Sequence, residues 1–462
     1  MSKAEFEFDV PASLPDGWKW TPLEELMDQP KQDIVDGPFG SNLKASEYVE
    51  DGIPIARLQN VDRNTFVHKN IKYLTRQKAE QLSRHTFKPE DILITKLGDP
   101  LGEACIAPSS IEHGVIVADL VRVRPAESKV VRRYLMYAIN SPLVARQFEK
   151  HTKGTTRPRV NLGMIRKLPI PVAPREMQAG VVAEIEKQFS RLDEAVANLK
   201  RVKANLKRYK AAVLKAAVSG RLVETEAELA RREGRSYETG PQLLQRILET
   251  RRSQWQGKGK YKEPAAPDTT GLPELPEGWV WCSGAQFFEW SSGEGLTEKN
   301  QRTGPYRVYG GNGISGHHDE YFVENPTIVV GRVGAHCGNV YVTKPECWIT
   351  DNAIYARSFP NDAPLEYLQI VFTQAGLTRS AAGSGQLFVN QRMLNEVSIP
   401  LPPLDEQLRI VEEVDRRLSL IHEVEAQVDA NLQRAERLRQ SILAQAFSGR
   451  LKLSEESVGE VA

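Results

Sequence analysis

The chain has 462 residues, of which 40% are hydrophobic and 26% are charged, and its formal net charge is +1. This composition is typical of a globular protein with two to four domains, so it excludes a largely disordered chain. The near-neutral balance favours neither a nucleic-acid nor a membrane partner, and any electrostatic argument must therefore be local.

The chain begins with an acidic and aromatic segment, Glu5 to Asp9, which does not resemble a secretion signal. None of the four cysteines belongs to a C-x-x-C pair, which disfavours a zinc or redox site and fits a reducing compartment. No apolar run approaches the roughly 20 residues of a membrane helix. We therefore expect a cytoplasmic protein without a metal site.

Residues 1–167 are predicted to form a first domain of short strands, turns and helices, because they are rich in glycine, proline, β-branched and aromatic residues. The domain opens with L-P-D-G-W-K-W from Leu14. A buried type of strand, Ile92 to Thr95, runs into Lys96 and a turn that contains Gly98. The fold class that we expect is α+β.

Basic and amide side chains mark a candidate DNA-binding surface on this domain, since Arg and Lys suit guanine and phosphate, and Asn suits adenine. The alternative is an ordinary solvated face. The densest basic patch consists of Arg146, Lys150, Lys153, Arg157, Arg159, Arg166 and Lys167. The further candidates are Lys44, Arg57, Asn60, Lys96, Thr155, Thr156 and Asn161.

Residues 168–222 are predicted to form a long helix that follows Pro174 and ends at Gly220. Its apolar residues recur three or four apart, which is the pattern of a coiled-coil seam. Residues 223–274 then form a charged connector. It holds one amphipathic helix near Leu243 to Leu248 and a solvated linker from Gly257 to Pro267.

Residues 275–397 are predicted to repeat the first domain, because they open with L-P-E-G-W-V-W and contain a second buried strand, Ile328 to Gly331, before Arg332 and Gly334. The domain has more acidic than basic residues, so we expect it to bind DNA weakly alone. Its candidate DNA-binding residues are Asn312, His317, Arg332, His336, Gln386, Asn390 and Arg392. His317 and His318 could be metal ligands, but adjacent side chains point apart and no third ligand is evident.

Residues 398–451 form a second long helix, and residues 452–462 a tail. From Ile399 the sequence matches the stretch from Ile170 without a gap, and both copies end in S-G-R-L. Each helix spans about 65 Å at 1.5 Å per residue. A lone helix would expose its apolar seam, so we expect the two copies to pair. The sequence does not determine their relative direction, and antiparallel packing is one possibility. Two similar domains on such a spacer would read two half-sites at a fixed separation.

This doubled pattern of L-P-x-G-W, I-P-x-x-P and a long helix closing in S-G-R-L resembles the specificity subunits of type I restriction–modification systems. G-P-F-G-S from Gly37 and Y-G-G-N-G from Tyr309 are similar to parts of their target-recognition domains. The resemblance covers essentially the whole chain. It implies two target-recognition domains that read an asymmetric bipartite DNA site, held apart by an antiparallel pair of helices.

The resemblance also implies partners. Two modification (methyltransferase) subunits would dock on the helices, and motor–nuclease restriction subunits would join the complex. S-adenosylmethionine, ATP and Mg²⁺ would be bound by those subunits and not by this chain. The candidate partner-binding residues are Ile185, Phe189, Leu192, Val414, Leu418 and Ile421. Arg157 and Arg159 correspond to Gln386 and Phe388, which puts a base contact common to both domains in doubt.

The sequence contains few motifs that are typical of catalytic sites. Asn325-Pro326-Thr327-Ile328 lacks the second proline and the aromatic residue of an amino-methyltransferase loop, and no Walker A loop is present. We therefore expect a non-catalytic chain. Two alternatives stay open: a metal-dependent endonuclease that uses Asp119, Glu127 and Lys129, and a coiled-coil scaffold without a nucleic-acid role.

Overall fold

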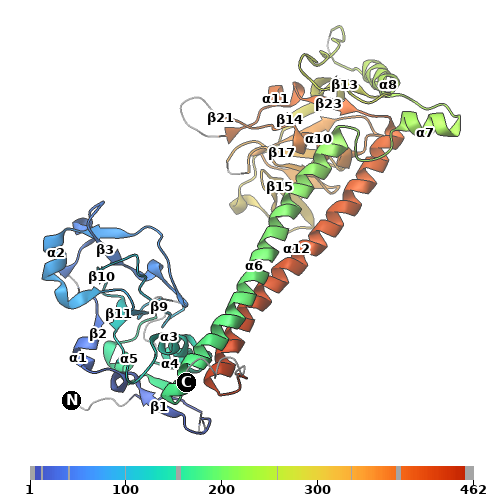
Figure 1. Cartoon of the computed structure of the whole chain (residues 1–462). Helices are drawn as coiled ribbons and strands as arrows, with labels where there is room; N and C mark the ends of the chain where they lie inside the picture. The colour runs from blue at the N-terminus through green and yellow to red at the C-terminus, as the bar shows by residue number, and fades with distance from the viewer. Residues whose placement is uncertain are drawn as a thin grey trace. The chain divides into compact units, whose positions relative to one another are not determined.

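The computed structural model describes residues 6–11, 14–39, 42–98, 100–151, 158–257, 259–334, 336–380 and 387–452, with the backbone alone for 379 and 380. The chain divides into two compact units, residues 1–200 with 429–462, and residues 201–428. Two long helices, α6 (Arg175–Val218) and α12 (Leu404–Phe447), each belong partly to both units (Figure 1).

The first unit contains a mixed domain built on two four-stranded sheets and one antiparallel pair, β1 (Lys19–Pro22) with β12 (Pro169–Val172). One sheet has the order β2 (Ile34–Asp36), β11 (Leu120–Val123), β8 (Ile92–Thr95) and β9 (Ala104–Ile106). The other has the order β6 (Lys72–Leu74), β3 (Ile53–Ala56), β10 (Gly114–Ile116) and β7 (Thr86–Phe87). A small hairpin joins β4 (Val61–Asp62) and β5 (Thr65–Phe66). The helices are α1 (Pro30–Asp33), α2 (Arg76–Gln81), α3 (Arg132–Asn140), α4 (Pro142–Lys150) and α5 (Leu162–Lys167).

The core of the first unit joins residues from both ends of the chain. Apolar residues of α3 are almost all buried, as expected for a helix between the sheet and the long helices. Ile185 and Phe189 of α6 enter the same core, together with Leu443 and Phe447 of α12. The ring of Phe447 packs edge-on against that of Tyr134, with centroids 5.1 Å apart. The end of α12 is therefore part of the core of the N-terminal domain.

The second unit repeats this plan. β13 (Val280–Ser283) pairs with β23 (Ser398–Leu401), and a four-stranded sheet has the order β14 (Glu289–Ser292), β20 (Ala353–Ser358), β17 (Ile328–Gly331) and β18 (Val340–Val342). A three-stranded sheet contains β16 (Gly313–His318), β15 (Tyr306–Gly310) and β19 (Cys347–Ile349), and β21 (Arg379–Ser380) pairs with β22 (Leu387–Phe388). The helices are α9 (Gly284–Phe287), α10 (Leu365–Gln374) and α11 (Gln391–Asn395).

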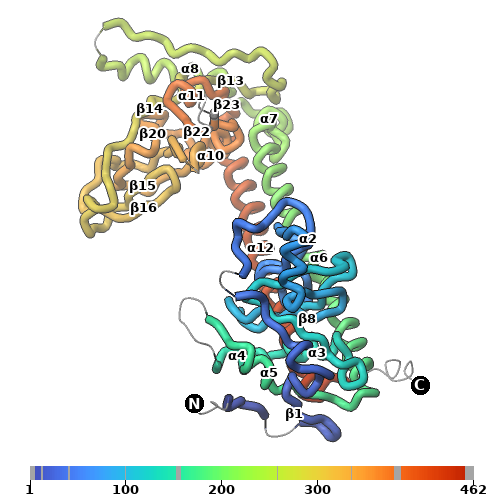
Figure 2. Tube along the Cα trace, turned by 90° about the vertical axis from the view of Figure 1, so that its left-hand side faces the viewer, coloured from blue at the N-terminus to red at the C-terminus, as the bar shows by residue number. Residues whose placement is uncertain are grey.

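The two long helices pair in antiparallel fashion. In the first unit the start of α6 packs on the end of α12, where Asp193 forms an ion pair with Arg439. In the second unit Val213 near the end of α6 shares a core with Val414 near the start of α12. Figure 2 shows the two helices side by side. The predicted α+β class and the predicted pairing are both confirmed, and the orientation that the sequence left open is antiparallel.

The repeat predicted from the sequence extends to matching hydrogen bonds. The Tyr134 hydroxyl donates to the Pro171 carbonyl oxygen at 2.9 Å, and the Tyr367 hydroxyl donates to that of Pro400 at 2.7 Å. Both acceptors lie at the same position of the short strand that precedes a long helix. The two halves of the chain therefore fold alike despite their different sequences.

Each long helix ends at a glycine in the left-handed region, with φ +66° at Gly220 and +70° at Gly449. Each glycine also packs closely on the proline of an opening L-P-x-G-W motif. A Cβ atom on Gly220 would lie 2.3 Å from Cγ of Pro276, and one on Gly449 would lie 2.0 Å from Cγ of Pro15. Only glycine fits these two joints without a shift of the chain.

The connector contains the predicted helix, α8 (Gly240–Ser253), and another helix that the sequence did not suggest, α7 (Glu226–Glu233). Glu226 is almost fully buried and pairs with Arg235 and with Arg409 of α12, at 2.5 and 2.7 Å. Its backbone N–H donates to the buried Glu406 carboxylate at 2.9 Å, and burial raises the pKa of Glu406. Among the described residues, none of the helices combines the length and hydropathy needed to cross a bilayer.

Candidate nucleic-acid interface

The turn after the central strand of the first domain pairs with residues 158–160, which include the basic candidate Arg159. The backbone N–H of Lys96 donates to the Asp119 carbonyl oxygen at 2.9 Å, and its carbonyl oxygen accepts from the Val160 N–H at 3.1 Å. Leu97 and Arg159 then form an isolated antiparallel bridge. The end of the strand therefore meets Arg159, one of the basic candidates.

The second domain has the same turn. The Arg332 N–H donates to the Asn352 carbonyl oxygen at 2.9 Å, and the Arg332 carbonyl oxygen accepts from the Val389 N–H at 2.9 Å. Val333 and Phe388 form the corresponding bridge. The recurrence of Lys96 and Arg332 at one sequence position thus reflects one backbone position in two copies of the fold.

The side chains at this shared position differ in their surroundings. Lys96 is 4% exposed, and its Nζ lies 2.6 Å from Oδ2 of Asp36 and 4.4 Å from the ring centroid of Phe39. Arg332 is exposed, and its guanidinium group has no ion pair or hydrogen bond with the described part of the chain. Lys96 is therefore held inside the first domain, whereas Arg332 is open to a ligand.

Two asparagines begin the short helices that precede the final strand of each domain. The Asn161 Oδ1 accepts from the Met164 N–H at 2.8 Å, and the Asn390 Oδ1 accepts from the Met393 N–H at 2.9 Å. Both are N-caps, which is a common use of asparagine before a helix. Their matching positions have this structural explanation, and a contact from either amide oxygen to adenine would compete with the cap.

Three further candidates of the first domain differ in how far their side chains are buried and bonded within its loops. Asn60 is fully buried, and its amide donates to the carbonyl oxygens of Val67 and Lys69 at 2.9 and 3.0 Å. Arg57 is half-buried and donates to the Asn70 carbonyl oxygen. Lys44 is exposed at the start of a 3-10 helix. Of these three residues, only Lys44 is exposed.

The basic patch of the first domain is partly neutralised by nearby carboxylates. Lys150 pairs with Asp9 at 2.5 Å, and this hydrogen bond lowers the pKa of Asp9. Lys167 pairs with Glu24 at 2.6 Å, and Arg159 lies 3.5 Å from Asp119. Arg166 donates to a backbone carbonyl oxygen, and Arg146 is exposed. The candidates Lys153, Thr155, Thr156 and Arg157 lie outside the described residues.

In the second domain, the turn that contains Asn312 packs against the backbone beside Arg332. Asn312 is exposed in the two-residue turn between β15 and β16, and a Cβ atom on the neighbouring Gly311 would lie 3.7 Å from Cα of Gly331. His336 is also exposed, on the loop that follows Arg332. These side chains form the open part of the candidate site.

The remaining candidates of the second domain differ in position and in availability. His317 is exposed but lies toward the far end of β16 from Asn312. Arg392 is exposed and donates to Glu396 at 2.8 Å, which raises the pKa of Arg392. Gln386 lies outside the described residues.

Exposed apolar side chains border both copies of the turn, and sequence reasoning missed them. Phe39 is 58% exposed in the first domain, and Val333 and Leu387 are 40% and 39% exposed in the second. The alternation of apolar residues did not distinguish them from core residues. G-P-F-G-S offered the one usable signal, since a glycine on each side of Pro38-Phe39 favours a surface turn.

The residues assigned to partner binding form the seam between the chain's own helices. Ile185, Phe189, Val414 and Ile421 are buried, and the first three belong to the hydrophobic cores of their units. Leu192 and Leu418 are partly buried at the margins of the same cores. These side chains hold the helices together, so the surface that is free for another subunit consists of different residues.

The three residues of the endonuclease alternative are not brought together. Asp119 precedes β11, whereas Glu127 and Lys129 follow it, and a strand of four residues spans about 13 Å. Glu127 pairs with Arg132, and the Lys129 Nζ donates to the Met27 carbonyl oxygen at 2.6 Å. Within the described ranges, no group of three or more His, Cys, Asp and Glu residues could hold a metal ion.

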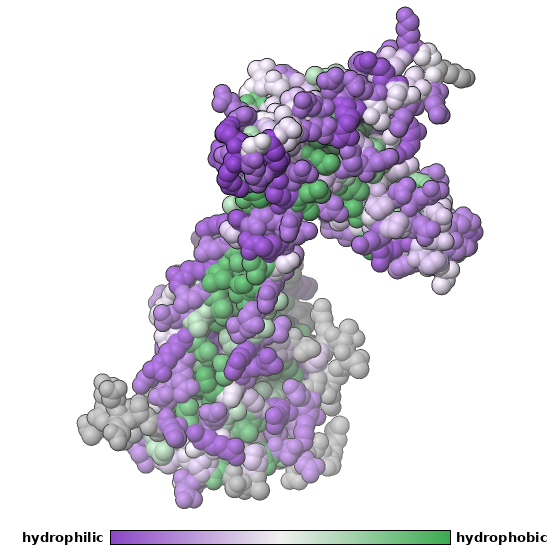
Figure 3. Space-filling model, turned by 90° about the vertical axis from the view of Figure 1, so that its right-hand side faces the viewer, coloured by the Kyte–Doolittle hydropathy of each residue, from purple (hydrophilic) through white to green (hydrophobic). Residues whose placement is uncertain are grey.

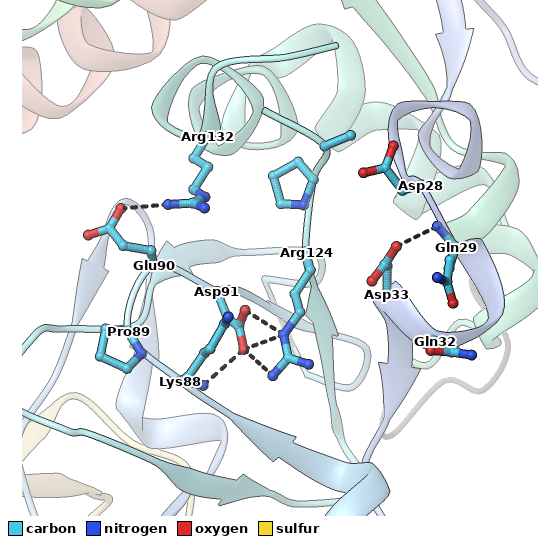
Figure 4. A pocket seen from close by; sticks show the side chains of 12 residues that line it. Asp28, Gln29, Gln32, Asp33, Lys88, Pro89, Glu90, Asp91, Arg124 and Arg132 are labelled. Carbon is cyan, nitrogen blue, oxygen red and sulfur yellow. Dashed lines mark hydrogen bonds and ion pairs between the residues drawn. The ribbon is translucent and has the colours of Figure 1, made fainter. Parts of the chain in front are cut away.

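A polar pocket with a volume of 340 Å³ lies at the other end of the β8–β11 pair from Lys96 (Figure 4). Arg124 donates to both carboxylate oxygens of Asp91, at 2.8 and 2.9 Å, and the Lys88 N–H donates to the same carboxylate. Arg132 lies 3.8 Å from Glu90. These paired charges tie the strand ends together, so the pocket is separate from the candidate interface.

Comparisons with known proteins agree with this architecture. A family model described as "Type I restriction modification DNA specificity domain" matches residues 276–434. The type I restriction enzyme EcoKI specificity subunit of Escherichia coli K12 is 22% identical over 456 residues, which cover 95% of this chain and 90% of the relative. The EcoBI specificity subunit of Escherichia coli is 23% identical over 439 residues, covering 89% and 83%.

Two solved structures share the fold. A chain from a study of complex assembly and conformational transition of the type I R-M system superposes with a TM-score of 0.63 and 17% identity, covering 96% of this chain and all of that one. The HsdS subunit from Thermoanaerobacter tengcongensis gives a TM-score of 0.52 with 17% identity and covers 96% and 99%. With its doubled domains and antiparallel helices, this chain is similar over most of its length to the specificity subunits of type I restriction–modification systems.

Proposed function

We propose that this chain recognises an asymmetric, bipartite DNA site for a type I restriction–modification complex and carries out no chemistry itself. The observation that supports this most directly is the single turn that occurs in both domains with different side chains, Lys96 in one and Arg332 in the other. Two domains that share one backbone conformation but carry different side chains at this turn can recognise two different half-sites.

The paired helices would set the spacing between the half-sites. Their seam is apolar in each unit, and Gly220 and Gly449 fix each helix end against a domain. A rigid connection of this kind is what lets dimeric DNA-binding proteins measure half-site separation. In this chain the two readers would be covalently linked and free to differ.

The partners would supply the chemistry. We propose that two modification subunits bind S-adenosylmethionine and methylate an adenine that is flipped out of the duplex. Restriction subunits with ATP and Mg²⁺ would cleave unmodified DNA. The second domain has more acidic than basic residues, so its complex with DNA would depend on phosphate contacts made by these partners.

An exposed apolar strip on the paired helices is our candidate docking surface for a modification subunit. Val202 and Tyr209 of α6, and Leu420 and Val424 of α12, are each between 41% and 51% exposed. Helical spacing places each pair on the same flank of its seam. Figure 3 shows apolar surface along the long helices.

Aspartate at both Leu420 and Val424 should weaken the complex with the modification subunit at least about tenfold, or 1.4 kcal/mol, because uncompensated carboxylates would enter the interface. Affinity can be measured by titrating labelled modification subunit. The matched control places aspartate at Ser419 and Ala426, which are exposed on the other flank of α12. Equal affinity for the two double variants would contradict this docking surface.

The proposed function is tested by co-expressing the chain with its modification subunit and mapping methylated adenines across the genome. We expect one asymmetric bipartite sequence, absent without this chain. Exchange of residues 18–167 for those of another specificity subunit should change one half-site and leave the other intact. Changes in both half-sites, or DNA cleavage by the purified chain with Mg²⁺ alone, would refute the proposal.

A further inference from the structure

Strand register identifies which residue of the second domain replaces Asp36. In the first domain, Val121 of β11 is paired with Ile94 on one side and with Asp36 on the other. The following residue, Gly37, donates its N–H to the Leu120 carbonyl oxygen at 3.2 Å. Asp36 therefore ends the strand that lies two strands away from the Lys96 turn.

Each of these pairings has an equivalent in the second domain. Ile354 of β20 is paired with Val330 on one side and with Ser292 on the other. Gly293 then donates its N–H to the Ala353 carbonyl oxygen at 3.1 Å, as Gly37 does to Leu120. Ser292 thus occupies the position of Asp36, just as Arg332 occupies that of Lys96.

This replacement removes the carboxylate that would neutralise Arg332. In the first domain Asp36 lies 2.6 Å from the Lys96 ammonium group, and both side chains are largely buried. In the second domain the Ser292 hydroxyl is exposed and its polar neighbour is the amide of Gln391, at 3.5 Å. A serine cannot balance a guanidinium charge, so Arg332 remains available.

We propose that Ser292 and Arg332 form a specificity determinant in which the missing carboxylate leaves Arg332 free to contact the edge of a guanine base, whereas Asp36 closes the equivalent position in the first domain. The inference rests on the proposed function. Arginine binds guanine O6 and N7 through two parallel donors. Exposed residues around the Arg332 turn include Asn312, Val333 and Asn352, and amide and apolar side chains can contact the edges of adenine and thymine bases.

The experiment restores the carboxylate. The full chain, assembled with its modification subunits, carries Ser292→Asp, Arg332→Ala or both, and binds a duplex that contains the sequence mapped by methylation. We expect roughly 10- to 100-fold weaker binding for each variant, and no further loss for the double variant, because all three lack a free arginine. Discrimination against a change of one guanine should disappear in the half-site of the second domain.

The matched control is Asn361→Asp, which adds one negative charge to the same domain. Asn361 is exposed on the loop after β20, at the opposite end of that strand from Ala353. The Asn361→Asp variant should bind the DNA duplex with an affinity within about twofold of that of the wild-type chain. Thermal unfolding of all variants checks that they fold. If Asn361→Asp lost as much DNA affinity as Ser292→Asp, the effect would be due to net charge, and the inference would be overturned.

Two other outcomes would overturn the inference. Unchanged binding of Ser292→Asp would show that the two side chains do not interact. Uniformly weaker binding of Arg332→Ala to every sequence, with a smaller salt dependence, would show a phosphate contact. In both cases the wild-type complex still methylates its site. If the wild-type complex shows no sequence-specific methylation at all, it is the proposed function that fails.

Discussion

Replacement of Phe447 by alanine is expected to destabilise the first unit by about 3–5 kcal/mol, although this residue lies near the far end of the sequence. Phe447 is fully buried, packs against Tyr134 and belongs to the same core as Leu135 and Ile185. Its loss leaves a cavity between the last turn of α12 and α3. Urea unfolding, followed by hydrogen exchange in residues 14–151, measures the effect.

The control for this prediction is Leu438→Ala on the same helix. Leu438 is 42% exposed, so its truncation should cost less than about 1 kcal/mol. If Phe447→Ala changed exchange only in α12 and left the sheet of the first domain protected, the assignment of α12 to that core would be wrong. Equal effects of the two substitutions would lead to the same conclusion.

Replacement of Lys96 by methionine should also destabilise the first domain by about 3–5 kcal/mol, because it leaves Asp36 largely buried without its cation. Methionine keeps most of the apolar volume, so the loss measures charge and not packing. Thermal and urea unfolding of the full chain give the difference in free energy of unfolding. The repeat offers an exact counterpart in Arg332→Met.

Arg332→Met should change stability by no more than about 0.5 kcal/mol, since Arg332 is exposed and has no partner in the described part of the chain. DNA affinity should show the reverse order, with the larger loss at position 332. Similar stability losses for Lys96→Met and Arg332→Met would mean that both residues serve the fold, and the functional difference between them would be lost.

The architecture was predictable because it depends on patterns that the sequence repeats. The seams of α6 and α12 follow a spacing of three and four residues, and Gly220 and Gly449 terminate the helices as capping rules require. The central strands before Lys96 and Arg332 were also found, because each is a short apolar run before a glycine turn. Local sequence patterns were sufficient to predict these elements.

The uses of individual polar residues were less predictable, since they depend on tertiary contacts. Lys96 and Arg332 look alike in sequence, but the partner of Lys96 is 60 residues away, at Asp36. Asn60 was selected for adenine chemistry, but its amide is fully used within a loop. The short helix α7 was missed because its buried Glu226 depends on Arg409, which lies in the other long helix.

The closure of the N-terminal domain by the end of α12 has a consequence for how the protein is made. On the ribosome the first domain emerges early, but its core lacks Leu443 and Phe447 until the whole of α12 has been translated. About 250 residues separate the two events, or roughly 12–50 s at bacterial and eukaryotic elongation speeds. During that interval the nascent chain exposes an unfilled apolar surface, which should make it a substrate for chaperones and the slowest part of the molecule to mature.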